Sequence, residues 1–72
     1  MLSDLLMWNK IGRIVTLLSE RLEVSGERAL DIFYTSRTNE QLHDEHTGLY
    51  LMSDLYIVDA VIRELREQRA EY

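Results

Sequence analysis

The sequence predicts an all-α protein, a small bundle of three main helices plus one short helix or turn, near residues 4–23, 26–36, 39–46 and 54–69. Apolar residues recur at three- and four-residue intervals through most of the chain, which is the spacing that places them on one face of a helix. A residue that favours helix N-termini stands at the beginning of each segment. The chain has no proline, and its one strand-like segment, 48–52, cannot form a sheet alone.

The length of the chain, 72 residues, limits it to a single domain, residues 1–72. A chain of this size buries about 60% of its unfolded surface, which suffices for a small core and not for a buried active-site cleft. Such small domains usually need a further source of stability. Because the sequence has no cysteine, a disulfide is excluded, and a metal, self-association or a partner protein remains.

The first helix is predicted to begin after Ser3, an N-cap residue, with the carboxylate of Asp4 in the first turn, where the helix dipole favours negative charge. Its apolar stripe consists of Met7, Trp8, Ile11, Ile14, Val15, Leu18 and Leu22. This stripe predicts an amphipathic helix of about 20 residues.

The second helix is predicted to begin after its cap, Ser25, and to run to about Ser36. Its inward face is expected to consist of Ala29, Leu30, Phe33 and Tyr34. This spacing predicts a shorter amphipathic helix than the first.

The third element is predicted from a capping-box pattern between Thr38 and Gln41, in which the two side chains would bond to each other's free backbone amides. The pattern indicates a short helix, or only a turn, from Asn39 to about His46. Gly48 follows at the position where a left-handed residue ends a helix.

The last helix is predicted to begin after the cap Ser53, with an i,i+4 ion pair between Asp59 and Arg63 on its surface. Its inward face is expected to consist of Leu55, Val58, Val61, Ile62 and Leu65. The apolar stripe ends there, so residues 66–72 are expected to fray or project.

The charge of the chain argues against nucleic acid as a partner. The net charge is −5 and no segment is strongly basic, whereas binding to a phosphate backbone depends on Lys and Arg. A helix-turn-helix DNA binder fits the two helices around Ser25 only superficially, because its recognition helix from Glu27 to Ile32 would not be basic.

The first residues lack the basic region of a signal peptide, and no apolar run approaches the roughly 20 residues of a membrane span. We therefore expect a cytoplasmic protein.

The two histidines, His43 and His46, are the only candidate metal ligands that the pattern suggests. Residues three apart share a helix face, so both rings could reach one ion, and Glu45 would then make a small metal-dependent hydrolase conceivable. The zinc-protease motif, however, places its histidines four apart, and no third ligand can be named. The competing interpretation is a solvated helix end. We expect no enzymatic activity and no cofactor.

Some apolar residues lie away from the predicted inward faces, and they are the candidate interaction surface: Leu6, Leu17 and Ile32. One interpretation is an exposed strip for a protein partner or a second copy of the chain. The other is that the first helix is central and covered on two sides. Gly12 lies inside the first helix, where glycine costs about 1 kcal/mol relative to alanine. A close approach of another backbone at this position would justify that cost. The sequence leaves these alternatives open.

A family resemblance covers the chain from about Ile11 to Leu65. The residues that carry it are Ser25, Ala29, Leu30, Phe33, Ser36, Thr38, Leu42, Asp44, Thr47, Gly48, Leu49, Tyr50, Ser53, Tyr56, Ile57, Val58, Asp59, Glu64 and Leu65. In these positions the chain resembles a bacterial family catalogued as domain of unknown function three-seven-nine-one. The resemblance implies a compact helical protein, and a gene arrangement similar to two-gene toxin–antitoxin or accessory modules. It implies no catalytic or binding residues.

These observations lead to a hypothesis about function. We expect a non-enzymatic protein–protein interaction module, in the role of the neutralising or accessory member of a two-gene module. One alternative is a homodimeric scaffolding protein whose first helices pack together. Another is a small metal-binding protein that uses the segment from His43 to His46.

Overall fold

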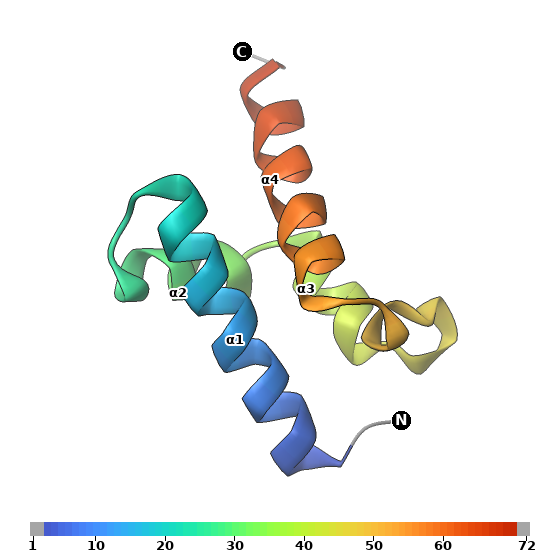
Figure 1. Cartoon of the computed structure of the whole chain (residues 1–72). Helices are drawn as coiled ribbons and strands as arrows, with labels where there is room; N and C mark the ends of the chain where they lie inside the picture. Colours follow the sequence, from blue (N-terminus) through green and yellow to red (C-terminus); the bar gives the residue numbers. More distant parts are fainter. Residues whose placement is uncertain (1–2, 71–72) are drawn as a thin grey trace.

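The computed structural model describes residues 3–70 of the chain. In this part of the chain there are four α-helices, two short 3₁₀ turns and no strand (Figure 1). The elements in order are α1 (Asp4–Leu22), α2 (Gly26–Tyr34), α3 (Arg37–His43), η1 (Glu45–Thr47), η2 (Leu49–Leu51) and α4 (Asp54–Ala70). The predicted all-α class is confirmed, with three longer helices and one short one.

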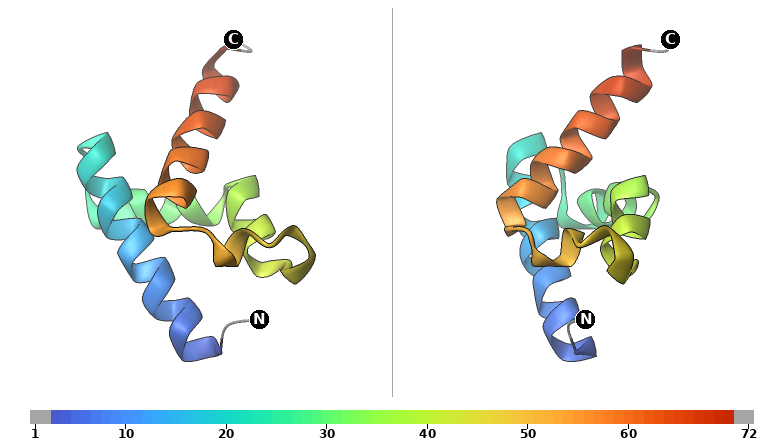
Figure 2. Two further views of the ribbon diagram at one scale, coloured as in Figure 1. Left: turned by 45° about the vertical axis from the view of Figure 1, so that its right-hand side comes forward. Right: turned by 90° about the vertical axis from the view of Figure 1, so that its right-hand side faces the viewer.

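All four helices contribute buried residues to one hydrophobic core. α1 packs against both α2 and α4, while α3 packs against α4 and the two 3₁₀ turns. Figure 2 shows that the last turns of α4 extend beyond the other helices, and that the beginning of α1 and the end of α4 lie at opposite ends of the molecule. None of the helices in residues 3–70 is long and apolar enough to cross a membrane.

Serine side chains cap the helices, as the sequence predicts at three of four places. The hydroxyl oxygens of Ser3, Ser25 and Ser53 accept hydrogen bonds from backbone N–H groups three residues further on, at 3.3, 3.1 and 3.1 Å. The predicted capping box at Thr38 is wrong. Ser36 is the cap of α3 instead and accepts from the N–H of Asn39 at 3.1 Å.

The third helix therefore begins and ends earlier than predicted. α3 ends at His43, and the carboxylate of Asp44 then accepts from the N–H of His46 at 3.0 Å to begin η1. The two histidines consequently belong to different elements. Gly48 has a φ of 69°, which confirms the predicted left-handed residue, although it separates η1 from η2. The strand-like segment is the 3₁₀ turn η2.

The core confirms most of the predicted apolar stripes. Its buried residues are Met7, Ile11, Ile14, Leu18, Ala29, Phe33, Leu42, Ile57, Val58 and Val61. Four predicted core positions are wrong: Trp8 and Leu55 are 61% and 49% exposed, and Tyr34 and Leu30 are 46% and 38% exposed. In α4 the buried stripe runs through Ile57, so this helix is rotated relative to the prediction because it also packs against α3.

The predicted ion pair within α4 is also wrong. Asp59 accepts from Arg21 of α1 at 3.3 Å, so the pair joins two helices rather than two turns of one. α4 remains helical to Ala70, one residue beyond the predicted end. The predicted fraying concerns residues 66–72, of which 71–72 lie outside the described residues.

Candidate interaction surfaces

The candidate metal ligands are exposed side chains at the edge of the molecule. The His46 side chain is 89% exposed, and its Nδ1 lies 3.2 Å from a carboxylate oxygen of Asp44. His43 is exposed at the last position of α3. Within residues 3–70 no three His, Cys, Asp or Glu side chains are grouped in a way that could hold a metal ion. The described residues therefore supply no third protein ligand beside the two histidines.

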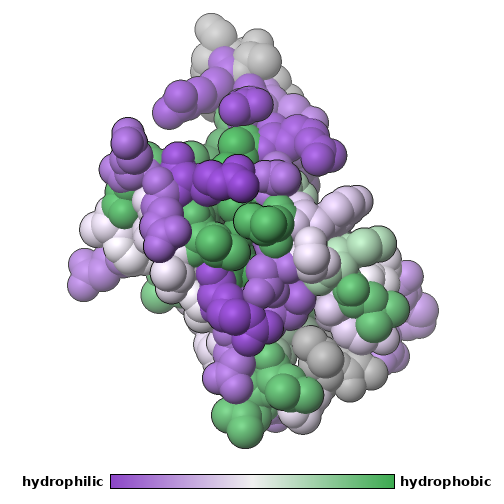
Figure 3. All heavy atoms as spheres, in the orientation of Figure 1, coloured by the Kyte–Doolittle hydropathy of each residue, from purple (hydrophilic) through white to green (hydrophobic). Residues whose placement is uncertain are grey.

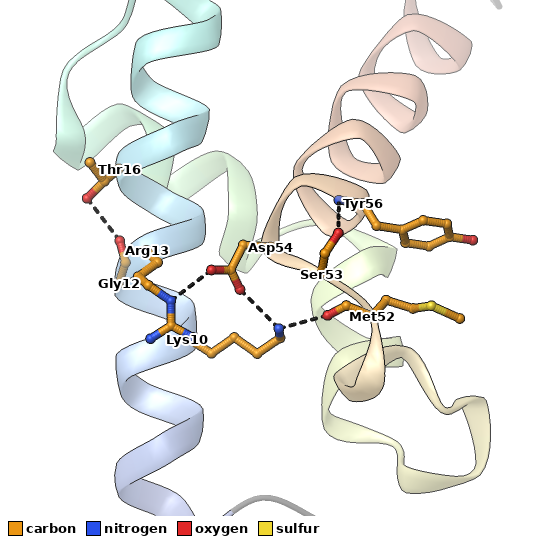
Figure 4. Close-up of polar contacts among 8 residues, drawn as sticks. All are labelled: Lys10, Gly12, Arg13, Thr16, Met52, Ser53, Asp54 and Tyr56. Atoms are coloured by element: carbon orange, nitrogen blue, oxygen red, sulfur yellow. Dashed lines mark hydrogen bonds and ion pairs between the residues drawn. The ribbon is translucent and has the colours of Figure 1, made fainter.

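One polar cluster joins α1 to the beginning of α4. The buried Lys10 donates from Nζ to the carbonyl oxygen of Met52 at 2.8 Å and to Asp54 at 3.0 Å, and Arg13 donates to the other Asp54 oxygen at 2.7 Å (Figure 4). Burial alone would raise the pKa of Asp54, but the hydrogen bonds and positive charges of Arg13 and Lys10 outweigh it and lower the pKa. Both carboxylate oxygens are used, so the cluster is structural.

A second polar cluster lies between α3 and α4. The buried carboxylate of Glu64 accepts from the backbone N–H groups of Arg37 and Thr38 at 2.9 and 3.1 Å, and from the Thr38 hydroxyl at 3.0 Å. These donors belong to the first turn of α3, where a negative charge is favourable. Sequence reasoning missed this role, although Glu64 lies three residues after the buried Val61 and so shares its helix face.

The three predicted interaction residues lie in three different places. Leu6 is 54% exposed near the beginning of α1. Leu17 is half-buried in the second half of α1, and Ile32 is half-buried on α2; both pack against the core. Of the two interpretations that the sequence leaves open, exposure therefore holds for Leu6, and partial covering holds for Leu17 and Ile32.

An exposed apolar patch begins in η2 and continues into the first turns of α4. Its members, which we call the η2–α4 patch, are Leu51, Met52, Leu55 and Tyr56, with exposed fractions of 73%, 45%, 49% and 49%. In Figure 4 the side chains of Met52 and Tyr56 both point away from α1. The patch is thus an apolar surface that α1 does not cover.

A second apolar surface follows one side of α1, where the side chains of Leu5 and Trp8 are 71% and 61% exposed. It continues as a shallow groove, which we call the α1 groove, along Trp8, Asn9, Gly12, Arg13, Thr16, Leu17 and Asp54. A Cβ atom placed on Gly12 would meet no atom within 4 Å. Gly12 is therefore an open notch in the middle of this helix face.

A third surface is a groove of about 490 Å³ between the end of α1, α2 and α4. Its apolar floor consists of Leu22, Val24, Ile32, Ile62 and Leu65. Its rim consists of Arg21, Arg28, Arg66 and Arg69. We call it the arginine groove. Figure 3 shows apolar atoms between the end of α1 and α4, with hydrophilic residues on both sides. Sequence patterns could not reveal this groove, because its arginines come from three helices.

Comparisons with protein-family models, with curated proteins and with solved structures each find no match to this chain. The family resemblance described from the sequence therefore stays a prediction.

Proposed function

We propose that this chain is a cytoplasmic, non-enzymatic protein–protein interaction module, the accessory or neutralising member of a two-gene module. The observation that carries the proposal is the η2–α4 patch. Nine large apolar side chains are exposed in the described part of the chain, and four of them belong to this patch. Apolar side chains that are exposed as a group, rather than singly, are candidates for a protein interaction site.

The composition of the η2–α4 patch also fits a protein partner. Aromatic residues and methionine are enriched in protein interfaces, and the patch has one of each, Tyr56 and Met52, beside two leucines. The charged residue within this segment, Asp54, bonds to Lys10 and Arg13 of α1. Meanwhile the two internal polar clusters, around Asp54 and Glu64, have their oxygens engaged by hydrogen bonds within the fold. These observations favour binding over catalysis.

An affinity capture of the tagged chain from its native host, read by mass spectrometry, tests the proposal. We expect one stoichiometric partner that is lost when Leu51→Gln and Leu55→Gln are combined. The matched control is Leu30→Gln, which replaces a leucine that is 38% exposed on α2 and should keep the partner. Recovery of the tagged chain alone, or a partner that both variants keep, would contradict the proposal for this surface.

The α1 groove supports a second candidate, a homodimer in which the first helices pack together. The specific observation is Gly12, which leaves open space on a helix face beside the exposed Trp8. Small residues allow two helix backbones to approach closely. Light scattering at high micromolar concentration tests this candidate: a dimer that Gly12→Gln dissociates would support it, and a strict monomer would exclude it.

A further inference from the structure

The basic residues of this acidic chain are concentrated at one groove. The chain carries 8 Lys and Arg against 13 Asp and Glu. Four of the 8 basic residues, Arg21, Arg28, Arg66 and Arg69, form the rim of the arginine groove, and no carboxylate from the described residues lines it. The groove is therefore a local region of positive charge on a molecule whose net charge is −5.

Helix-end electrostatics do not explain this arrangement. Arg21 and Arg69 lie in the last turns of α1 and α4, where the helix dipole favours a positive charge. Arg28, however, lies in the first turn of α2, where the same dipole disfavours it. A cation at that position has a cost for the isolated helix, which its exposed pair with Asp31 offsets only weakly, and a negatively charged ligand in the groove would offset it further.

The arginines are available for a ligand. Arg21 and Arg28 pair with Asp59 and Asp31 at 3.3 Å, and all four side chains are at least half exposed. Exposed ion pairs of this kind contribute little, so their arginines can exchange partners readily. Arg66 and Arg69 are exposed and have no ion-pair partner among residues 3–70.

The floor of the arginine groove is apolar and packs against the hydrophobic core. Leu22, Val24, Ile32 and Ile62 are half-buried and pack against the core. On α4 the groove follows residues 62, 65, 66 and 69, the i, i+3, i+4, i+7 spacing of one helix face. From Ile62 to Arg69 this face is about 10 Å long, or two helical turns.

We propose that the arginine groove binds an acidic amphipathic helical segment of a partner protein, an inference that rests on the proposed function and names the chemistry of the partner. The apolar face of that segment lies on the floor, and its Asp or Glu side chains reach the rim. Arginine is suited to this, because its guanidinium binds a carboxylate through two parallel hydrogen bonds. Charge complementarity identifies the occupant: the rim is positive and the floor excludes a fully charged ligand.

Nucleic acid fits the same groove less well. Proteins that bind single strands stack bases on aromatic side chains, and none of the aromatic residues within 3–70 lines this groove. The rest of the chain is acidic and would repel an extended polyanion. A short acidic helix contacts only the groove itself and avoids this repulsion.

Selection from displayed peptides on the immobilised full chain tests the assignment. Three sets of amphipathic helices of about 12–15 residues share one apolar face and differ in their flanking residues, which are Asp/Glu, Ser/Gln or Lys/Arg. We expect enrichment of the acidic set. Enrichment of the neutral or basic set, or of no set, would overturn the proposal.

Charge reversal then locates the site. We expect Arg66→Glu to weaken a selected acidic peptide about tenfold or more, the effect of losing one charge-assisted contact. Arg63→Glu is the matched control, because Arg63 is exposed on the same helix but does not line the groove, and it should change the affinity less than twofold. Equal effects of the two reversals would overturn the proposal. Arg66→Gln, which only removes the charge, provides a second variant, and circular dichroism verifies that each variant is folded.

The test separates this proposal from the proposed function. A host partner that Arg66→Glu keeps and the combined Leu51→Gln and Leu55→Gln variant loses would leave the interaction module standing and overturn the groove assignment. Acidic peptides that depend on Arg66, with no host partner lost from the η2–α4 patch, would support the groove and contradict the patch. Arg66-dependent binding of poly-uridine RNA, or Arg66-dependent self-association, would also overturn the assignment to a protein segment of a partner.

Discussion

The Glu64 carboxylate of α4 accepts both the backbone N–H and the hydroxyl of Thr38 in the first turn of α3. The two residues are 8% and 4% exposed, so their contact is shielded from water. α3 has only seven residues, too few for a helix to be stable by itself. The carboxylate satisfies free amides at the beginning of α3 and fixes this helix against α4, which also keeps Leu42 in the core.

The first prediction concerns this contact. Glu64→Gln should lower the free energy of unfolding by about 1–3 kcal/mol, because the amide NH₂ of Gln would face a backbone N–H that now donates to Glu64. Denaturant unfolding followed by circular dichroism measures the change. Glu67→Gln is the control: its side chain is 62% exposed and 3.7 Å from Arg37, so we expect a change within about 0.5 kcal/mol. Equal losses in both variants would contradict the structural role of Glu64.

The capping residues show what the sequence could predict. Ser3, Ser25 and Ser53 were predictable because an N-cap depends only on local backbone geometry and on the hydroxyl at that position. Thr38 was misassigned because its hydroxyl donates to Glu64, 26 residues further along the chain, while Ser36 caps the helix. Local patterns do not reveal which of two hydroxyl residues is engaged by a distant carboxylate.

The rotation of each helix was predictable only in part. The stripe from Met7 to Leu18 was predicted correctly for its buried members, whereas Trp8, beside it, is exposed. An apolar stripe sets the side that faces the core, but its edges depend on where neighbouring helices end. The arginine groove depends on the packing of three helices, so none of its electrostatic character could be predicted from neighbours in the sequence.

The second prediction compares two glycines. Gly12→Ala should raise the free energy of unfolding by about 0.5–1 kcal/mol, because alanine favours the helix and its Cβ would meet no atom within 4 Å. Gly48→Ala should lower it by about 1–2 kcal/mol, because Gly48 has a φ of 69° that an L-residue adopts with strain. Thermal unfolding measures both changes. A loss of stability in Gly12→Ala would indicate that another chain occupies the space over Gly12, as the homodimer requires.

The third prediction concerns zinc. His43 and His46 lie on different elements, and no third ligand joins them in residues 3–70. A stable zinc site needs three or four protein ligands. We therefore expect no stoichiometric zinc in purified, tag-free protein and no rise in melting temperature on adding zinc. A stoichiometric metal content that the combined His43→Ala and His46→Ala variant loses would contradict this expectation and restore the metal-binding alternative.

The fourth prediction concerns the pH dependence of the Asp54 cluster. The pKa of Asp54 is lowered from its ordinary value of 3.8: burial raises it, and the hydrogen bonds and charges of Arg13 and Lys10 lower it by more. A lowered pKa in the folded state means that the ionised carboxylate stabilises the fold above the unfolded pKa. This stabilisation is lost as the pH falls through the folded pKa.

Asp54→Asn isolates that contribution. We expect the variant to be less stable by about 1–3 kcal/mol at neutral pH, because the buried Lys10 loses its charged partner, and the difference from the wild type should shrink as the pH falls below about 4. Denaturant unfolding at a series of pH values measures it. Asp59→Asn, at the exposed pair with Arg21, is the control and should stay within about 0.5–1 kcal/mol at every pH. A difference for Asp54→Asn that stays constant from neutral to acidic pH would show that its carboxylate charge does not stabilise the junction of α1 and α4.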